Sequence, residues 1–244
     1  MNRLKEHPFA VDALFERSLV LTFAVLKEEV AGLIPPCLSL DTHQDKWAFI
    51  AVAMVQTKNL RPKGFPKFMG SDFFLIGYRV FVRYSNAQGK RLRGLYILKS
   101  ETDSRRMTFF GNMFTEYHYT TTDIQQQSNT SSETISSSKS QFQVRIRKTA
   151  GEVALPEGSV FQDWKEARRF AGPLPFTFTY DAGSKKVLII EGLRENWDPK
   201  PVDVASFNFN FLDTLGLSFY KLANAFAIYD IPYHWKKGKV EQWK

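Results

Sequence analysis

The sequence lacks most of the features that mark specialised classes of protein. Its 244 residues include one cysteine, Cys37, which excludes an internal disulfide framework and a cysteine-rich zinc site. No run of about 20 apolar residues occurs, and the stretch 19–26 near the start contains a threonine. The charged residues at the N-terminus are not followed by an apolar stretch, so we expect no targeting segment. We therefore expect a cytoplasmic protein with no membrane partner.

The charges are also unclustered. The chain has 33 Lys and Arg residues against 25 Asp and Glu, a formal net charge of +8. Nucleic-acid binding needs Lys and Arg gathered on one face or in a run. The densest groups, 90–93, 145–148 and 236–239, are short and typical of a solvated surface. We expect no nucleic-acid partner, whereas a small anion needs only one or two inward arginines.

Motifs for common chemistries are missing. There is no Gly-x-Gly-x-x-Gly, phosphate-binding loop or His-Glu-x-x-His, and no Gly-x-Ser-x-Gly. His7, His43, His118 and His234 are far apart in sequence, so we expect no metal and no cofactor. Cys37 follows two prolines with no base beside it, which indicates a buried small hydrophobic residue.

The sequence is rich in phenylalanine and in stretches where apolar and polar residues alternate. The chain has 22 Phe, and aromatic residues make up 15% of it. Alternating apolar residues predict strands over 47–55, 73–84, 92–98, 142–146, 176–180, 187–191 and 207–211. Short helices are expected at 27–33 and 162–170. This pattern predicts one α+β domain over 1–244, mainly antiparallel β: a barrel-centred or wrapped sheet with a few short peripheral helices.

The stretch 120–141 is rich in Ser, Thr, Gln and Asn. Low-complexity disorder is one interpretation of such a composition. Threonine favours strands, however, and the stretch leads directly into the strand expected at 142. We therefore expect a strand–loop–strand insertion that turns near 128–132.

Three side chains are candidates for chemistry. Glu116 and His118 are two residues apart, so on a strand they would share a face as an acid–base pair. The alternative for them is an exposed ion pair. Arg79 interrupts the apolar run 73–82, where a charge is costly unless it is paired or faces a ligand.

Several segments, in their order along the chain, resemble a known family. They are Phe15-Glu16-Arg17-Ser18-Leu19-Val20, the stretch 33–42, Asp45-Lys46-Trp47, the strand 76–82, the return strand 94–98 and the stretch 111–119. This order, over roughly the first 120 residues, is similar to that of the acetoacetate decarboxylase-like superfamily, in an uncharacterised YqjF-like branch. The resemblance implies a β-barrel-centred fold with a polar pocket in an apolar interior.

The resemblance also implies which functional positions are kept. The decarboxylases use a lysine in a Gly-x-Pro-Lys-Lys segment, whereas the corresponding stretch here, 111–117, has neither Pro nor Lys. A glutamate of the family is replaced by an apolar residue, about Leu75, while Arg17 matches the family's pocket arginine. We therefore expect no Schiff-base decarboxylation.

Our leading hypothesis is a protein that binds a small anionic molecule, a carboxylate, in an aromatic-lined pocket with Arg17 and Arg79 as anchors. The alternative is an enzyme that uses Glu116 and His118 for proton transfer on a carbonyl substrate. A third hypothesis is an aromatic platform for nucleic acid or a protein partner. The sequence leaves open whether any reaction is catalysed and whether the chain forms a homo-oligomer.

Overall fold

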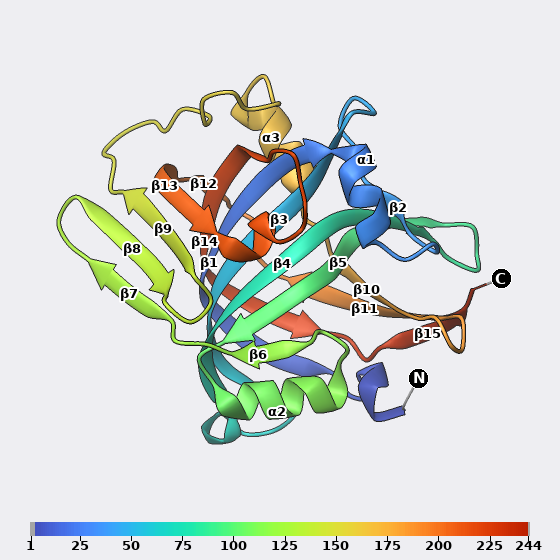
Figure 1. The fold of residues 1–244 in the computed structure, drawn as a ribbon. Helices are drawn as coiled ribbons and strands as arrows, with labels where there is room; N and C mark the ends of the chain where they lie inside the picture. Colours follow the sequence, from blue (N-terminus) through green and yellow to red (C-terminus); the bar gives the residue numbers. More distant parts are fainter. Residues whose placement is uncertain (1–2, 244) are drawn as a thin grey trace.

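Seven long strands close into a ring around the centre of the molecule (Figure 1). The computed structural model describes residues 3–243. The strands of the ring, in spatial order, are β14 (Lys221–Trp235), β1 (Val11–Leu26), β3 (Trp47–Pro62), β4 (Ser71–Ser85), β5 (Arg91–Thr102), β10 (Phe176–Asp181) and β11 (Lys186–Arg194). Neighbours are antiparallel except β5 and β10, which run parallel.

The ring is closed by a short antiparallel pairing between its last two strands. Gly192, Leu193 and Arg194 of β11 pair with Trp235, His234 and Tyr233 of β14. Beyond this seam, β11 pairs instead with β15 (Lys239–Gln242). Three further strands add to the large sheet: β2 (Ser39–Leu40), β6 (Tyr119–Thr121) and β12 (Lys200–Pro201).

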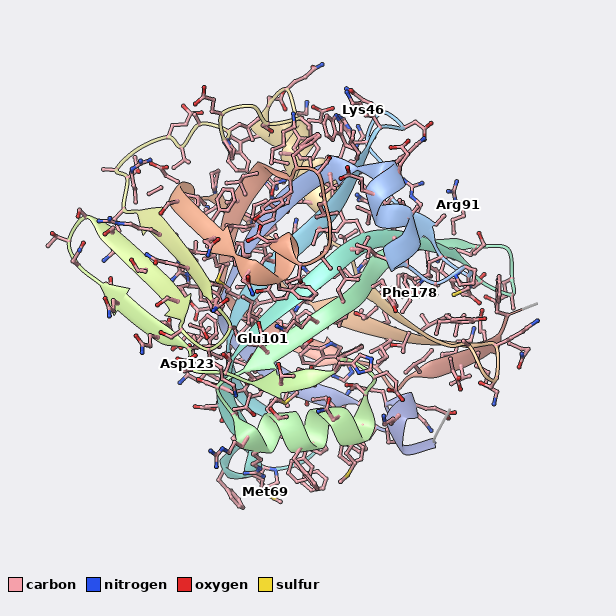
Figure 2. The ribbon with its side chains drawn as sticks, in the orientation of Figure 1. Lys46, Met69, Arg91, Glu101, Asp123 and Phe178 are labelled. Atoms are coloured by element: carbon pink, nitrogen blue, oxygen red, sulfur yellow. The ribbon has the colours of Figure 1, made fainter. Side chains whose placement is uncertain are left out.

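A second, four-stranded sheet lies against the outside of the ring (Figure 1). Its strands, in spatial order, are β13 (Asp203–Phe209), β9 (Phe142–Arg147), β8 (Ser132–Ser137) and β7 (Gln125–Ser128). The main core fills the space between the two sheets and includes Phe23, Tyr78 and Phe209. Figure 2 shows Phe178 in the interior, with Lys46 and Arg91 at the periphery.

The helices are short and peripheral. They are α1 (Lys27–Val30), which continues as the 3-10 turn η2 (Ala31–Leu33), α2 (Arg105–Phe114), α3 (Trp164–Ala171) and α4 (Asn210–Asp213). Two further 3-10 turns are η1 (Arg3–Glu6) and η3 (Lys67–Met69). Helix α2 covers one end of the ring, and α3 lies near the other end (Figure 1). No helix in the described range 3–243 is both long and apolar enough to cross a bilayer.

Alternation along each strand separates two environments. On β4, Ile76, Tyr78 and Val80 face the core between the sheets. Their alternates Arg79 and Phe81 face the inside of the ring. Because successive side chains of a strand point to opposite faces, one apolar strand serves both a packed core and an internal cavity.

The expected α+β fold with a mainly antiparallel, wrapped sheet is confirmed. Within the polar stretch 120–141 lie β7 and β8, joined by a turn at 129–131. The strand expected over 207–211 is partly wrong, because β13 ends at Phe209 and α4 begins there. Strands β1 and β14 were not predicted from alternation, because both bury two faces over part of their length.

Candidate functional site

A cavity of about 120 Å³ lies inside the ring of strands. Small inward side chains on β1 and β3, namely Ser18, Ala51 and Ala53, leave this space unfilled. Aromatic rings such as Phe15 and Phe81 form much of the remaining wall. A volume of this size has room for several water molecules or a small organic molecule.

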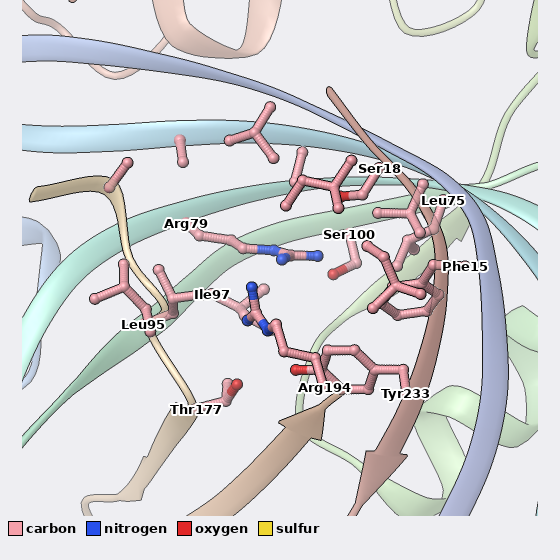
Figure 3. A pocket seen from close by; sticks show the side chains of 18 of the residues that line it. Phe15, Ser18, Leu75, Arg79, Leu95, Ile97, Ser100, Thr177, Arg194 and Tyr233 are labelled. Atoms are coloured by element: carbon pink, nitrogen blue, oxygen red, sulfur yellow. The ribbon is translucent and has the colours of Figure 1, made fainter. Parts of the chain in front are cut away.

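Arg79 enters the cavity from β4 (Figure 3). The pairing of β4 with β5 slips by one residue next to it, since Tyr78 pairs with Lys99 and Arg79 with Ile97. Such bulges bend a strand and re-aim its side chains. The side chain of Arg79 lies across Gly77, where a Cβ atom would be 3.0 Å from its Nε. The glycine therefore makes room for the guanidinium group.

Arg194 enters the same cavity from the closing seam of the ring (Figure 3). Its guanidinium carbon is 4.7 Å from the ring centroid of Trp197 and 5.5 Å from that of Tyr233. Cations are attracted to aromatic faces at such distances. Tyr233 itself lies over Gly192, where a Cβ would be 2.1 Å from its hydroxyl oxygen. The aromatic pair thus holds the second guanidinium in place.

Among residues 3–243, neither arginine has an acidic partner. Within the described chain, none of the residues lining the cavity is Asp, Glu, Lys or His. The Nε atoms of Arg79 and Arg194 are buried without a hydrogen-bond partner. Arg79 retains some accessible surface, but that surface faces the cavity, and protein encloses the side chain. Burial lowers the pKa of Arg79, and the charge of Arg194 lowers it further. An enclosed cation beside a half-buried one, with no acid between them, is costly unless an anion joins them.

The other polar groups of the cavity add hydrogen-bond donors. Burial raises the pKa of Tyr119 to about 12 and that of Tyr117 further, so both phenols keep their protons at neutral pH. The Tyr117 hydroxyl faces Thr177 without a hydrogen bond of good geometry, and the indole N–H of Trp197 is buried without a partner. A site rich in donors and positive charge suits a ligand that carries acceptors and negative charge.

The structure separates the two arginines expected to act together. Arg79 and Leu75 line the cavity, whereas Arg17 lies on the outer face of β1. There its Nη1 donates to Oε1 of Glu133 on β8, at 2.5 Å. The Arg17 side chain is 22% exposed and its partner 16%. This ion pair connects the ring to the second sheet.

Glu116 and His118 do not lie on a strand, so the expected shared strand face is wrong. Residues 115–118 connect α2 to β6 without regular structure, and His118 has a positive φ of 51°. Glu116 accepts a hydrogen bond from Nζ of Lys5 at 3.1 Å, and His118 is exposed. Both line a surface hollow on the far side of Tyr117 from the arginine cavity. They are therefore close together but apart from the two guanidinium groups.

No lysine of the described range 3–243 lines the cavity. Nζ of Lys99 pairs with Oε1 of Glu101 at 2.9 Å and lies 5.0 Å from the ring centroid of Phe211, outside the ring. Across the part of the chain that the structure describes, no three His, Cys, Asp or Glu side chains gather in a way that would hold a metal ion. Burial raises the pKa of the Cys37 thiol to about 11, which disfavours the reactive thiolate.

Sequence reasoning did not identify Arg194. The strand was expected to end at Glu191, but β11 continues to Arg194. Ile190 packs beside the cavity tyrosines, so continued alternation puts Gly192 and Arg194 on the same inward face. Extending the strand by three residues, to the end of β11, would have found it. Trp197, in the following loop, gives no such signal.

The sequence profile of DUF2071, a family described as an uncharacterized conserved protein, matches residues 13–232. No curated protein matches the chain at a significant level.

Several solved structures share the fold. Acetoacetate decarboxylase from Legionella pneumophila aligns with a TM-score of 0.62 and 11% identity, over 94% of this chain and 87% of that one. An acetoacetate decarboxylase-like enzyme from Sphingomonas wittichii RW1 has a TM-score of 0.57 and 10% identity, over 99% and 94% of the two chains. The enduracididine biosynthesis enzyme MppR, in complex with the condensation product of pyruvate and imidazole 4-carboxaldehyde, has a TM-score of 0.53 and 8% identity, over 96% and 88%. At such identities the likeness concerns the fold alone.

Proposed function

The chain belongs to the DUF2071 family, with an acetoacetate decarboxylase-like fold, and we propose that it binds a small carboxylate in its central cavity. One observation carries the proposal: Arg79 and Arg194 enter the same enclosed cavity with no acidic side chain in its described lining. A bound anion would remove the repulsion between them and satisfy their donors.

The chemistry of the lining favours a carboxylate over a bulkier anion. Guanidinium groups bind planar carboxylates through paired N–H···O bonds. The cavity volume of about 120 Å³ and its aromatic wall suit a small organic acid. By analogy of fold alone, MppR, whose structure holds the condensation product of pyruvate and imidazole 4-carboxaldehyde, shows that this fold can hold a small organic molecule.

Proton transfer by Glu116 and His118 has less support. Their hollow lies beyond Tyr117, so a substrate held by the guanidinium groups would not meet them. The cavity lining also offers no lysine for a Schiff base within residues 3–243. We therefore propose ligand binding without Schiff-base decarboxylation.

Titration calorimetry with charged and neutral partners of the same shape tests the proposal. We expect propanoate, butanoate and pyruvate to bind, and propanamide and butanamide to bind at least tenfold more weakly. Arg79→Met and Arg194→Met should each weaken carboxylate binding by tenfold or more, since a charged hydrogen bond is worth about 1.5–3 kcal/mol. Arg83→Met is the matched control, because Arg83 lies on the same strand but pairs with Asp41. Equal binding of acid and amide, or unchanged binding in both cavity variants, would contradict the proposal.

A further inference from the structure

A second hollow adjoins the arginine cavity at the end of the ring that α2 covers. Its volume is also about 120 Å³. The wall is formed by residues 7–9, Thr115, Tyr117, helix α2 and strands β1, β3, β4, β6 and β14. Among the described residues that line it, none is Lys, Arg, Asp or Glu. Such a hollow favours hydrocarbon, in contrast to the donor-rich cavity beside it.

A single set of side chains separates the two spaces. Phe15, Leu75, Tyr117, Tyr119 and Trp235 line both the cavity and the hollow. They therefore form a partition, defined by these five residues, with the guanidinium groups on one side and α2 on the other. The two spaces can therefore be connected by rotation of these side chains, without separating any paired strands.

The structure of α2 keeps the partition thin. The ring of Tyr119 lies against Gly111, where a Cβ atom would be only 2.4 Å from its Cδ2. A larger residue at that position would push the ring away from the helix. The glycine thus lets the tyrosine ring form the wall directly, with no further side chain between helix and partition.

The outer side of the hollow is also apolar. Phe110 lines the hollow and is 42% exposed, and its neighbour on α2, Phe109, is 61% exposed. Exposed aromatic side chains grouped on a surface helix mark a site of contact with an apolar partner. Here the partner that the geometry accommodates is the apolar part of a ligand whose charged end lies behind the partition.

We propose that the ligand of this protein is amphipathic: a carboxylic acid whose hydrocarbon or aryl part occupies the hollow under α2 while its carboxylate lies between Arg79 and Arg194. This inference rests on the proposed anion site. It goes beyond that site because it assigns a ligand class, an acid with an apolar tail, to a hollow that the anion site does not use.

A series of straight-chain acids tests the inference. We expect the affinity measured by calorimetry to rise about fourfold with each methylene group from butanoate to hexanoate to octanoate, the gain typical of burying a CH₂ group. If octanoate binds no more tightly than butanoate, the inference is overturned and the anion site stands. If no acid of any length binds, the anion site fails, and the inference fails with it.

Two neighbouring residues of α2 supply a matched pair of variants. Phe110→Ala removes a wall of the hollow, and we expect it to weaken octanoate binding at least fivefold while leaving butanoate binding unchanged. Phe109→Ala removes an exposed ring that does not line the hollow, so both acids should bind as in the unaltered protein. Unchanged butanoate affinity reports an intact fold in each variant. Equal effects of the two substitutions on octanoate binding would contradict the assignment.

Discussion

The guanidinium groups of Arg79 and Arg194 lie in the same cavity, although like charges repel (Figure 3). Arg79 comes from β4 and Arg194 from the seam between β11 and β14, more than a hundred residues further along the chain. Closure of the ring brings them together. The described lining supplies no carboxylate for either of them, so the arrangement is stabilised best when an anion lies between them.

The two arginines of β4 should respond in opposite ways to the same substitution. In ligand-free protein, Arg79→Met replaces an unpaired buried cation with an apolar side chain, and we expect the free energy of unfolding to rise by about 1–3 kcal/mol. Arg83→Met removes one of the two arginines that pair with the fully buried carboxylate of Asp41, while Arg93 remains, and we expect a loss of about 1 kcal/mol. Urea denaturation measures both. A loss of stability in Arg79→Met would show that the cation is already satisfied within the fold.

The ion pair of Arg17 with Glu133 should stabilise the contact between the two sheets and have no part in ligand binding. We expect Arg17→Met and Glu133→Gln each to lower the free energy of unfolding by about 1 kcal/mol, since the pair is mostly buried. The double variant should lower the free energy of unfolding by less than the sum of the two single effects. Butanoate affinity should stay within twofold. Loss of binding in Arg17→Met alone would return this residue to the ligand site that the family resemblance implied.

His7 should make stability depend on pH between about 5 and 7. Burial lowers its pKa below the ordinary value of 6.5, and its Nδ1 has no partner. The unfolded chain therefore binds a proton first as the pH falls, so the stabilisation is present above pH 6.5 and is lost below it. His7→Asn keeps a residue that tolerates the positive φ of 51° and should flatten this part of the profile. An unchanged slope in the variant would assign the effect to other groups.

Treatment with acetoacetate and sodium borohydride should leave the mass of the protein unchanged. Reduction traps a Schiff base only on a lysine that is neutral and reaches the substrate, which requires a desolvated site. Lys99, at the end of an apolar stretch of β5, pairs with Glu101 at 2.9 Å, and its side chain is 29% exposed. Intact-protein mass spectrometry detects an adduct directly. One stoichiometric adduct would contradict the proposal of binding without decarboxylase chemistry.

Parts of the fold and site could be predicted because their signals are local. The alternation in 73–84 placed β4, and the charge of Arg79 within that apolar run marked the residue as paired or facing a ligand. Two strands joined by a turn were expected within 120–141 because the stretch leads directly into the next strand, and β7 and β8 lie there.

The remaining parts depend on contacts between distant segments. The residues around Arg17 do not predict its pairing with Glu133, because that pairing follows from the packing of the second sheet on the ring. Likewise, the residues around Arg194 do not predict that it shares a cavity with Arg79, because only closure of the ring brings β11 and β4 around one space. Helix α2 was missed because its exposed rings Phe109 and Phe110 blur the usual amphipathic pattern.

A crystal structure of the protein grown with butanoate tests the central claim most directly. We expect density for one carboxylate inside the ring, with its oxygens within hydrogen-bond distance of the guanidinium nitrogens of both Arg79 and Arg194. A cavity without density, or butanoate bound only at the protein surface with Arg79 and Arg194 uncontacted, would contradict the account.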